Sequence, residues 1–151
     1  MNNVDEILYL IDWHRSPEEQ QQGIALAREV KCIKTFFQPC GPGYNKSVWE
    51  NCARIVSERT DEELIPYTID MLMWLQDSNW PGAELILLRL KNFSDFTIMS
   101  LIIKDMIPAL EAVGEVSWLM SIAELLENPN FENAIDDISK KNLDKYKRDT
   151  Q

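Results

Sequence analysis

The sequence contains few of the residues that most often carry catalytic or metal chemistry. It has one histidine, His14, and three cysteines, Cys32, Cys40 and Cys52, among 151 residues. The cysteines are odd in number and lack metal-ligand spacing, so we predict no zinc site and expect reduced thiols, as in a cytoplasm. No glycine-rich phosphate loop and no Gly-x-Ser-x-Gly turn occurs. We therefore predict no catalytic residues, no cofactor and no enzymatic activity.

Long apolar runs are also missing. No stretch approaches the roughly eighteen apolar residues that a membrane-spanning helix needs. The first six residues, Met-Asn-Asn-Val-Asp-Glu, do not combine a basic region with an apolar one, so no secretory signal is expected. These two absences predict a cytoplasmic protein that does not act at a membrane.

Positive charge is scarce outside the C-terminal tail. The formal net charge is −10, and residues 132–151 contribute nothing to it because they hold five acidic and five basic side chains. The excess negative charge therefore belongs to residues 1–131. Such a body repels nucleic acid and favours a basic protein partner.

Helix start signals recur along the chain, whereas no segment alternates with the period of a half-buried strand. Ser16, Ser47 and Thr60 are each followed three residues later by a glutamate, which is the pattern of a capping box. Pro66 and Pro108 lie beyond the first turn of their predicted helices and are expected to kink or break them. The pattern predicts an all-α fold.

The stretch Trp74–Ala83 connects two runs with helical spacing and is predicted to be a tight elbow. Asn79 is expected to cap the second helix, with Pro81 in its first turn. A short connection makes the two helices antiparallel neighbours. Trp80 and Asp77 have two interpretations: they close the turn, or they bind a partner.

The longest predicted loop covers residues 32–46. Its apolar residues Phe36, Phe37 and Tyr44 are expected to hold the loop against the core, or Tyr44 at its tip contacts a partner.

A weak internal repeat suggests how the helices are arranged. Pro66 and Pro108 lie 42 residues apart, and Ala83 and Ala123 lie 40 apart. This period is typical of HEAT and armadillo helix pairs. We predict a short right-handed stack of antiparallel helical hairpins, that is, a HEAT/armadillo-like α-solenoid. Residues 1–130 are expected to form one domain, followed by a partly frayed C-terminal helix in residues 131–151.

Four segments carry a resemblance to a known group of proteins: SPEEQQQGIALA, KSVWENCARI, TDEELIPY and WLQDSNWPGAELI. They resemble a bacterial family of small HEAT-like proteins of unknown biochemical activity, members of which look like immunity proteins against polymorphic toxins. The resemblance covers roughly Leu8 to Leu90. It implies a cytoplasmic protein that binds a cognate toxin stoichiometrically and blocks it.

From charge and resemblance together we predict a binding protein, monomeric or weakly dimeric, that covers a basic toxin domain such as a nuclease. Two alternatives remain: a helical-repeat adaptor or scaffold unrelated to toxins, and a helical-repeat hydrolase. An aromatic centre ringed by carboxylates suits a basic partner. The predicted partner-binding residues are Tyr44, Asp61, Glu62, Asp70, Asp77 and Trp80.

Overall fold

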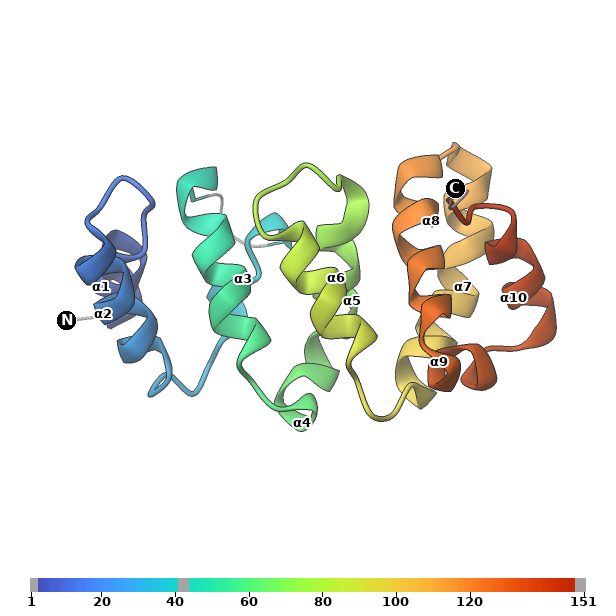
Figure 1. Ribbon diagram of the computed structural model, residues 1–151, viewed down its shortest axis with the longest axis horizontal. Coiled ribbons are helices and arrows are strands. Elements are labelled where there is room, and N and C mark those ends of the chain that lie inside the picture. Colours follow the sequence, from blue (N-terminus) through green and yellow to red (C-terminus); the bar gives the residue numbers. More distant parts are fainter. Residues whose placement is uncertain (1–2, 41–43, 149–151) are drawn as a thin grey trace.

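The computed structural model describes residues 3–40 and 44–148 of the chain (Figure 1). Throughout this part the regular elements are helices, and no strand is present. The predicted all-α fold is therefore confirmed.

Ten α-helices and six short 3-10 turns make up the described part. The α-helices are α1 (Asn3–Leu10), α2 (Pro17–Ala27), α3 (Trp49–Ser57), α4 (Asp61–Leu64), α5 (Thr68–Met73), α6 (Ala83–Lys91), α7 (Thr97–Val113), α8 (Val116–Ala123), α9 (Pro129–Ala134) and α10 (Asp137–Asp144). The 3-10 turns are η1 (Lys34–Phe36), η2 (Gln38–Cys40), η3 (Lys46–Val48), η4 (Ile65–Tyr67), η5 (Trp74–Gln76) and η6 (Glu124–Glu127).

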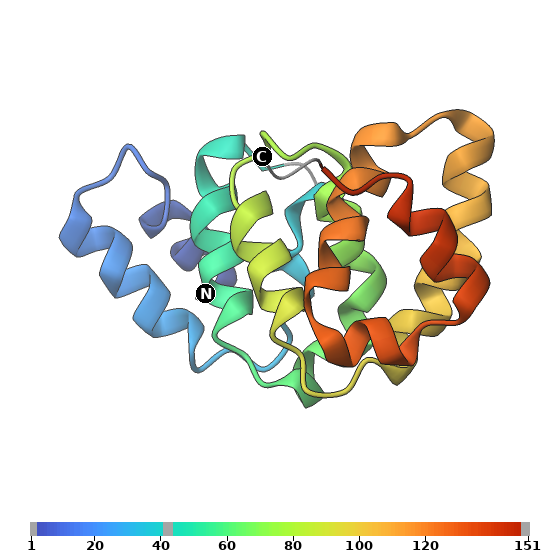
Figure 2. The same ribbon diagram turned by 45° about the vertical axis from the view of Figure 1, so that its right-hand side comes forward.

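The helices form a row of pairs along the longest dimension of the molecule. In Figure 1, α2, α3, α6 and α8 follow one another from left to right, with α5 and α7 behind α6 and α8. Neighbouring members touch, since α2 packs on α3, α3 on α6 and α7 on α8. Figure 2 shows α10 closing the end of the row beside α7 and α8. This row is consistent with the predicted stack of hairpins, whose right-handed superhelix stays a prediction.

The second pair in the row lacks a regular first helix. The segment between α2 and α3 forms the short turns η1, η2 and η3, of which η1 and η3 lie against α3 and η2 lies against α5. Phe36 and Phe37 are fully buried there, and the Phe37 ring stacks on Tyr67 with centroids 4.7 Å apart. Two prolines in this stretch disfavour a longer helix. The predicted attachment of this segment by its aromatic residues is confirmed for Phe36 and Phe37.

One apolar core runs along the row, from Ile7 in α1 to Leu143 in α10. Phe131 and Leu143 are both fully buried, so the C-terminal segment contributes to the same core as the rest. The last helix is nevertheless interrupted, because Ile135 adopts an extended conformation (φ −83°, ψ 146°) between α9 and α10. Ile138, on α10 after this interruption, is exposed.

Two of the three predicted capping boxes are present, at Ser16–Glu19 and Thr60–Glu63. The box at Ser47 is wrong. The Ser47 hydroxyl instead donates to the Asp12 carboxylate, 2.7 Å away, and Asn45 caps the preceding turn η3 by accepting from the Ser47 backbone N–H. Ser47 lies inside η3 and α3 begins at Trp49, so the Ser47 side chain is not at the N-cap position of α3.

The predicted cap at the elbow is also wrong. Helix α6 begins at Ala83, after Gly82 with a left-handed φ of 86°, and Asn79 lies before it in the turn. The Asn79 N–H donates to the Asp77 carboxylate, and the indole N–H of Trp74 donates to the Pro81 carbonyl at 3.0 Å. The hydrogen bond from the Trp74 indole therefore stabilises the elbow.

The two prolines behave differently. Pro66 interrupts its helix, which is divided into α4, η4 and α5 as expected. Pro108 lies inside the unbroken helix α7, so of the predicted kink or break the break is wrong. Both Pro108 and Lys104 are exposed, so water can bind the Lys104 carbonyl that lacks its helical donor.

The sequence repeat does not align structurally equivalent positions in every case. Ala83 begins α6, whereas Ala123 ends α8. The 40-residue correspondence therefore joins opposite ends of two helices, although both pairs belong to the same row.

Gly82 is expected to be irreplaceable at the crossing of α3 and α6. A Cβ there would lie 2.6 Å from the Ala53 Cβ and 3.0 Å from the Trp49 carbonyl oxygen, and φ is positive. Gly82→Ala should lower the free energy of unfolding by roughly 2–4 kcal/mol, the sum of the left-handed strain and the clash. Gly114→Ala is the matched control, because Gly114 has φ 73° but open space around it, and should lose about 1 kcal/mol. Urea denaturation measures both, and equal losses would contradict the packing argument.

Candidate functional site

The six predicted partner-binding residues do not form one patch. Tyr44, Asp77 and Trp80 belong to segments at the long edge of the row where α3 and α6 begin, the upper edge in Figure 1. Asp61 and Glu62 begin α4, which lies at the opposite, lower edge in Figure 1. Asp70 lies on α5 between the two edges and takes part in an interaction of its own.

Asp61 has a structural role. Its carboxylate accepts from the Arg89 guanidinium at 2.5 Å and from the backbone N–H and hydroxyl of Ser94, both at 2.9 Å. Burial by itself raises the pKa of Asp61, but the hydrogen bonds from Ser94 and Arg89 outweigh it and leave the pKa below its ordinary value. Both oxygens are occupied within the protein, so a partner cannot use them without breaking these bonds.

Trp80, in contrast, lies at the surface in a cluster of aromatic rings. It is half-buried, and its ring meets Trp49 edge to face at a centroid distance of 5.5 Å. Trp49 in turn meets the fully buried Trp74 at 6.3 Å. The ammonium of Lys46 lies 5.9 Å from the Trp80 ring. One part of the Trp80 ring therefore packs against the elbow, and the rest of the ring remains accessible to a partner.

A groove of about 350 Å³ opens beside Trp80, between α3 and α6. We call it the Trp80 groove; it is lined by Glu50, Ser78, Asn79, Trp80, Pro81, Gly82, Glu84 and Leu85. Two carboxylates and no basic side chain contribute to this lining. Both carboxylates lie in the first turn of a helix, where the dipole is worth roughly +0.5 charge each. Lys46, whose ammonium lies near the Trp80 ring, and Arg54, 3.6 Å from the Glu50 carboxylate, offset part of the remaining negative charge. Glu84 has no basic partner of this kind among the described residues, so it is the carboxylate that suits a cationic group beside the aromatic ring.

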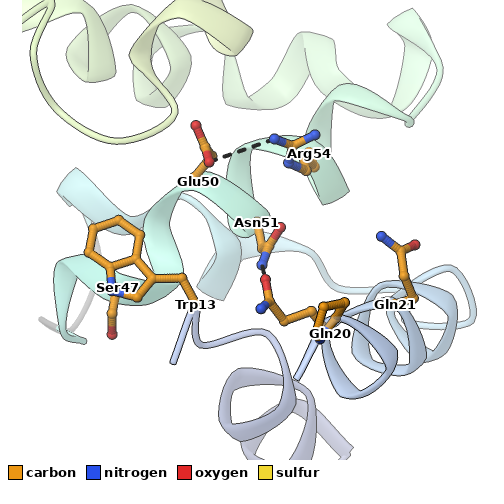
Figure 3. A pocket seen from close by; sticks show the side chains of 8 residues that line it. Trp13, Gln20, Gln21, Ser47, Glu50, Asn51 and Arg54 are labelled. Carbon is orange, nitrogen blue, oxygen red and sulfur yellow. Dashed lines mark hydrogen bonds and ion pairs between the residues drawn. The ribbon is translucent and has the colours of Figure 1, made fainter. Parts of the chain in front are cut away.

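A second groove of about 350 Å³ lies on the other side of Glu50, between α2 and α3 (Figure 3). We call it the Asn51 groove; it is lined by Trp13, Pro17, Gln20, Gln21, Ser47, Glu50, Asn51 and Arg54. Asn51 donates to the Ile11 carbonyl at 2.7 Å and to the Gln20 amide oxygen at 2.9 Å. Gln20 donates onward to the Arg15 carbonyl. The Asn51 groove is therefore polar, with walls fixed by hydrogen bonds.

Sequence reasoning missed Glu50 and Asn51. Their role depends on the α1–α2 turn and on the elbow, which are about 30–40 residues away in the chain. The sequence feature that could have pointed to them is the polar pair Glu50-Asn51, which follows Trp49 in a helix whose other face is apolar.

The positive charges of the chain are largely neutralised by intramolecular ion pairs. All six arginines are within 4 Å of a carboxylate, in pairs such as Arg28–Glu58 at 2.9 Å and Arg59–Glu63 at 2.9 Å. An arginine already bound to a carboxylate is a poor ligand for phosphate. The surface of the described residues thus favours cations over nucleic acid.

Groups for metal or thiol chemistry are not gathered at either groove. Within residues 3–40 and 44–148, no three His, Cys, Asp or Glu side chains are placed to hold a metal ion. Cys52 is fully buried, and burial raises the pKa of its thiol. Within the described ranges, every helix is too short or too polar to span a membrane.

Comparison with known proteins links the chain to one family model. The model, described as "Domain of unknown function (DUF5071)", matches residues 49–145. No curated protein and no solved structure matches the chain. The matched range contains the whole Trp80 groove but only the α3 side of the Asn51 groove, since α1 and α2 precede it.

Asp61→Asn is expected to destabilise the protein in a pH-dependent way. At pH 7 the variant should lose about 1–3 kcal/mol of unfolding free energy, because the charge-assisted bonds to Arg89 and Ser94 weaken. Because the pKa of Asp61 is lower in the folded protein than in the unfolded chain, Asp61 stabilises the fold fully above the unfolded pKa of about 3.9. This stabilisation is lost as the pH falls through the pKa of the folded protein. Urea titrations of both proteins at pH 7 and pH 3 measure this difference. Glu62→Gln, which makes no such bonds, should change stability far less; a pH-independent loss in Asp61→Asn would contradict the assignment.

Proposed function

The chain belongs to the DUF5071 family, whose description assigns no activity, and we propose that it is a binding protein that holds a basic protein partner at the Trp80 groove. Within this class we propose a bacterial cytoplasmic immunity protein that neutralises a toxin by stoichiometric binding. The observation that carries the proposal is the lining of the Trp80 groove, where Glu84 and the Arg54-paired Glu50 flank an accessible indole.

Charge supports this proposal at two scales. The whole chain carries a formal charge of −10, which steers a basic partner toward it and accelerates association. At short range, Glu50 and Glu84 can pair with a lysine or arginine of the partner while its aliphatic part lies on Trp80. A toxin whose active site binds nucleic acid or another anion presents such basic side chains, so covering them blocks the substrate path.

Toxin immunity is supported by the resemblance of the elbow and capping segments to immunity-like helical proteins. A helical adaptor with the same groove and no toxin is the competing function. Co-expression distinguishes them: a toxin domain encoded directly upstream of this gene should arrest growth alone and not when this chain is co-expressed. If growth stays arrested although both proteins are produced, the immunity function is wrong and the adaptor function remains.

Charge reversal in the Trp80 groove should slow association with the basic partner. In Glu50→Lys/Glu84→Lys, the association rate at low salt should fall about tenfold or more, and the rate should depend less on salt. Surface plasmon resonance across a salt series measures both quantities.

The matched control is Glu29→Lys/Glu62→Lys, which makes the same charge change at exposed positions outside both grooves. It should slow association only through the overall charge, so by clearly less than the groove variant. Equal effects of the two variants would show that net charge acts alone, and a larger effect of the control would move the binding surface to the α4 end.

A further inference from the structure

Asn51 is a buried side chain with an unused acceptor. Only 8% of the residue is exposed, and both hydrogens of its amide nitrogen are engaged by the Ile11 carbonyl and the Gln20 amide oxygen. The Ile11 carbonyl can only accept, so the Asn51 nitrogen must face it and the assignment of its oxygen is unambiguous. Figure 3 shows this oxygen on the side facing away from Gln20. No donor to it is present among the described residues, and it borders the Asn51 groove.

The Asn51 oxygen is not among the fully buried side-chain atoms that lack a partner, so water reaches it through the groove, and a ligand that donates there can take the place of that water. The surrounding walls supply both kinds of polar group. Arg54 and the Gln21 amide can donate, and the Glu50 carboxylate, 3.6 Å from Arg54, can accept. Trp13, which is 49% exposed, adds an apolar face at one end.

This combination suits the amide groups of a polypeptide backbone, which donate and accept in turn along an extended chain. The formal charges of Glu50 and Arg54 cancel, so the Asn51 groove does not by itself select a charged ligand. A phosphate backbone is disfavoured because Glu50 also borders the acidic Trp80 groove next to it.

Glu50 is the link between the two grooves, since it lines both. A chain that crosses the Asn51 groove can therefore extend a basic side chain past Glu50 toward Trp80 and Glu84. Helix α3 carries Glu50 and Asn51 side by side, so their relative position is fixed by the helix itself.

We propose that the two grooves together bind an extended, basic segment of the partner protein. Its backbone N–H donates to the Asn51 oxygen between Trp13 and Arg54, and a neighbouring arginine side chain enters the Trp80 groove. This inference rests on the proposed function, because it names the form in which the basic partner is recognised.

The test uses three capped heptapeptides and the ¹⁵N-labelled full chain in NMR titrations. The first is Gly-Ser-Gly-Arg-Gly-Ser-Gly. The second has the same sequence with N-methylated backbone amides flanking the arginine, which removes N–H donors. The third has citrulline in place of arginine, which removes the charge and keeps the shape. The signals followed are the Asn51 side-chain amide and the indole N–H groups of Trp13 and Trp80.

The arginine peptide should shift all three signals. N-methylation should abolish the shift at Asn51 and keep that at Trp80, whereas citrulline should weaken binding about tenfold and reduce the Trp80 shift most. Trp13→Ala should weaken the arginine peptide about threefold to tenfold, and Tyr9→Ala, an exposed aromatic outside both grooves, should leave its affinity unchanged.

Two results overturn the inference and leave the proposed function standing. One is a shift confined to Trp80 with all arginine-containing peptides, which would mean that only a side chain is bound. The other is an equal effect of the N-methylated peptide at Asn51. A shift at Asn51 with maltohexaose and not with any peptide would assign the Asn51 groove to a sugar and also overturn it. If no probe shifts any of the signals, the inference is also overturned. The proposed function, in contrast, fails only if the charge-reversal variant binds the basic partner as wild type does.

Discussion

The row of helices depends on hydrogen bonds to the backbone carbonyls at the C-terminal ends of α2, α3 and α6. The last carbonyls of an α-helix have no donor within the helix, and those near a core need one. Here the donor comes each time from the next part of the chain. Arg59 donates to the carbonyls of Ala27 and Val30 after α2, Arg89 to those of Ser57 and Arg59 after α3, and Asn128 to that of Lys91 at the end of α6. Each pair of helices therefore holds the end of the pair before it, and the pairs stay in one line.

This arrangement makes the two long edges of the row different. At the edge where α2, α3 and α6 terminate, polar side chains such as Arg89 and Asp61 are engaged in hydrogen bonds within the protein. At the opposite edge, where α3 and α6 begin, the chain turns through Gly82 and leaves two grooves open on either side of Glu50. The proposed binding surface lies at this second edge.

The candidate site was predictable in part. Trp80 was identified as a possible contact because a tryptophan in a short turn is conspicuous, and the Trp80 groove contains it. Asp61 was equally conspicuous as an acidic residue at a helix start, yet its carboxylate is bound to Arg89, 28 residues later. Asn51 could not be identified from the sequence, because its side chain is buried by the α1–α2 turn, 40 residues earlier, and not by its own helix.

The features that could be predicted from the sequence alone depend on neighbours within a turn of helix. These are the all-α fold and the capping boxes at Ser16 and Thr60. Such interactions join residues three or four positions apart, so their pattern can be read along the chain. In contrast, the position of Ser47 inside η3 and its hydrogen bond to Asp12, 35 residues earlier, follow from the tertiary structure. A bond between distant segments exists only once the helices have packed, so no local pattern predicts it.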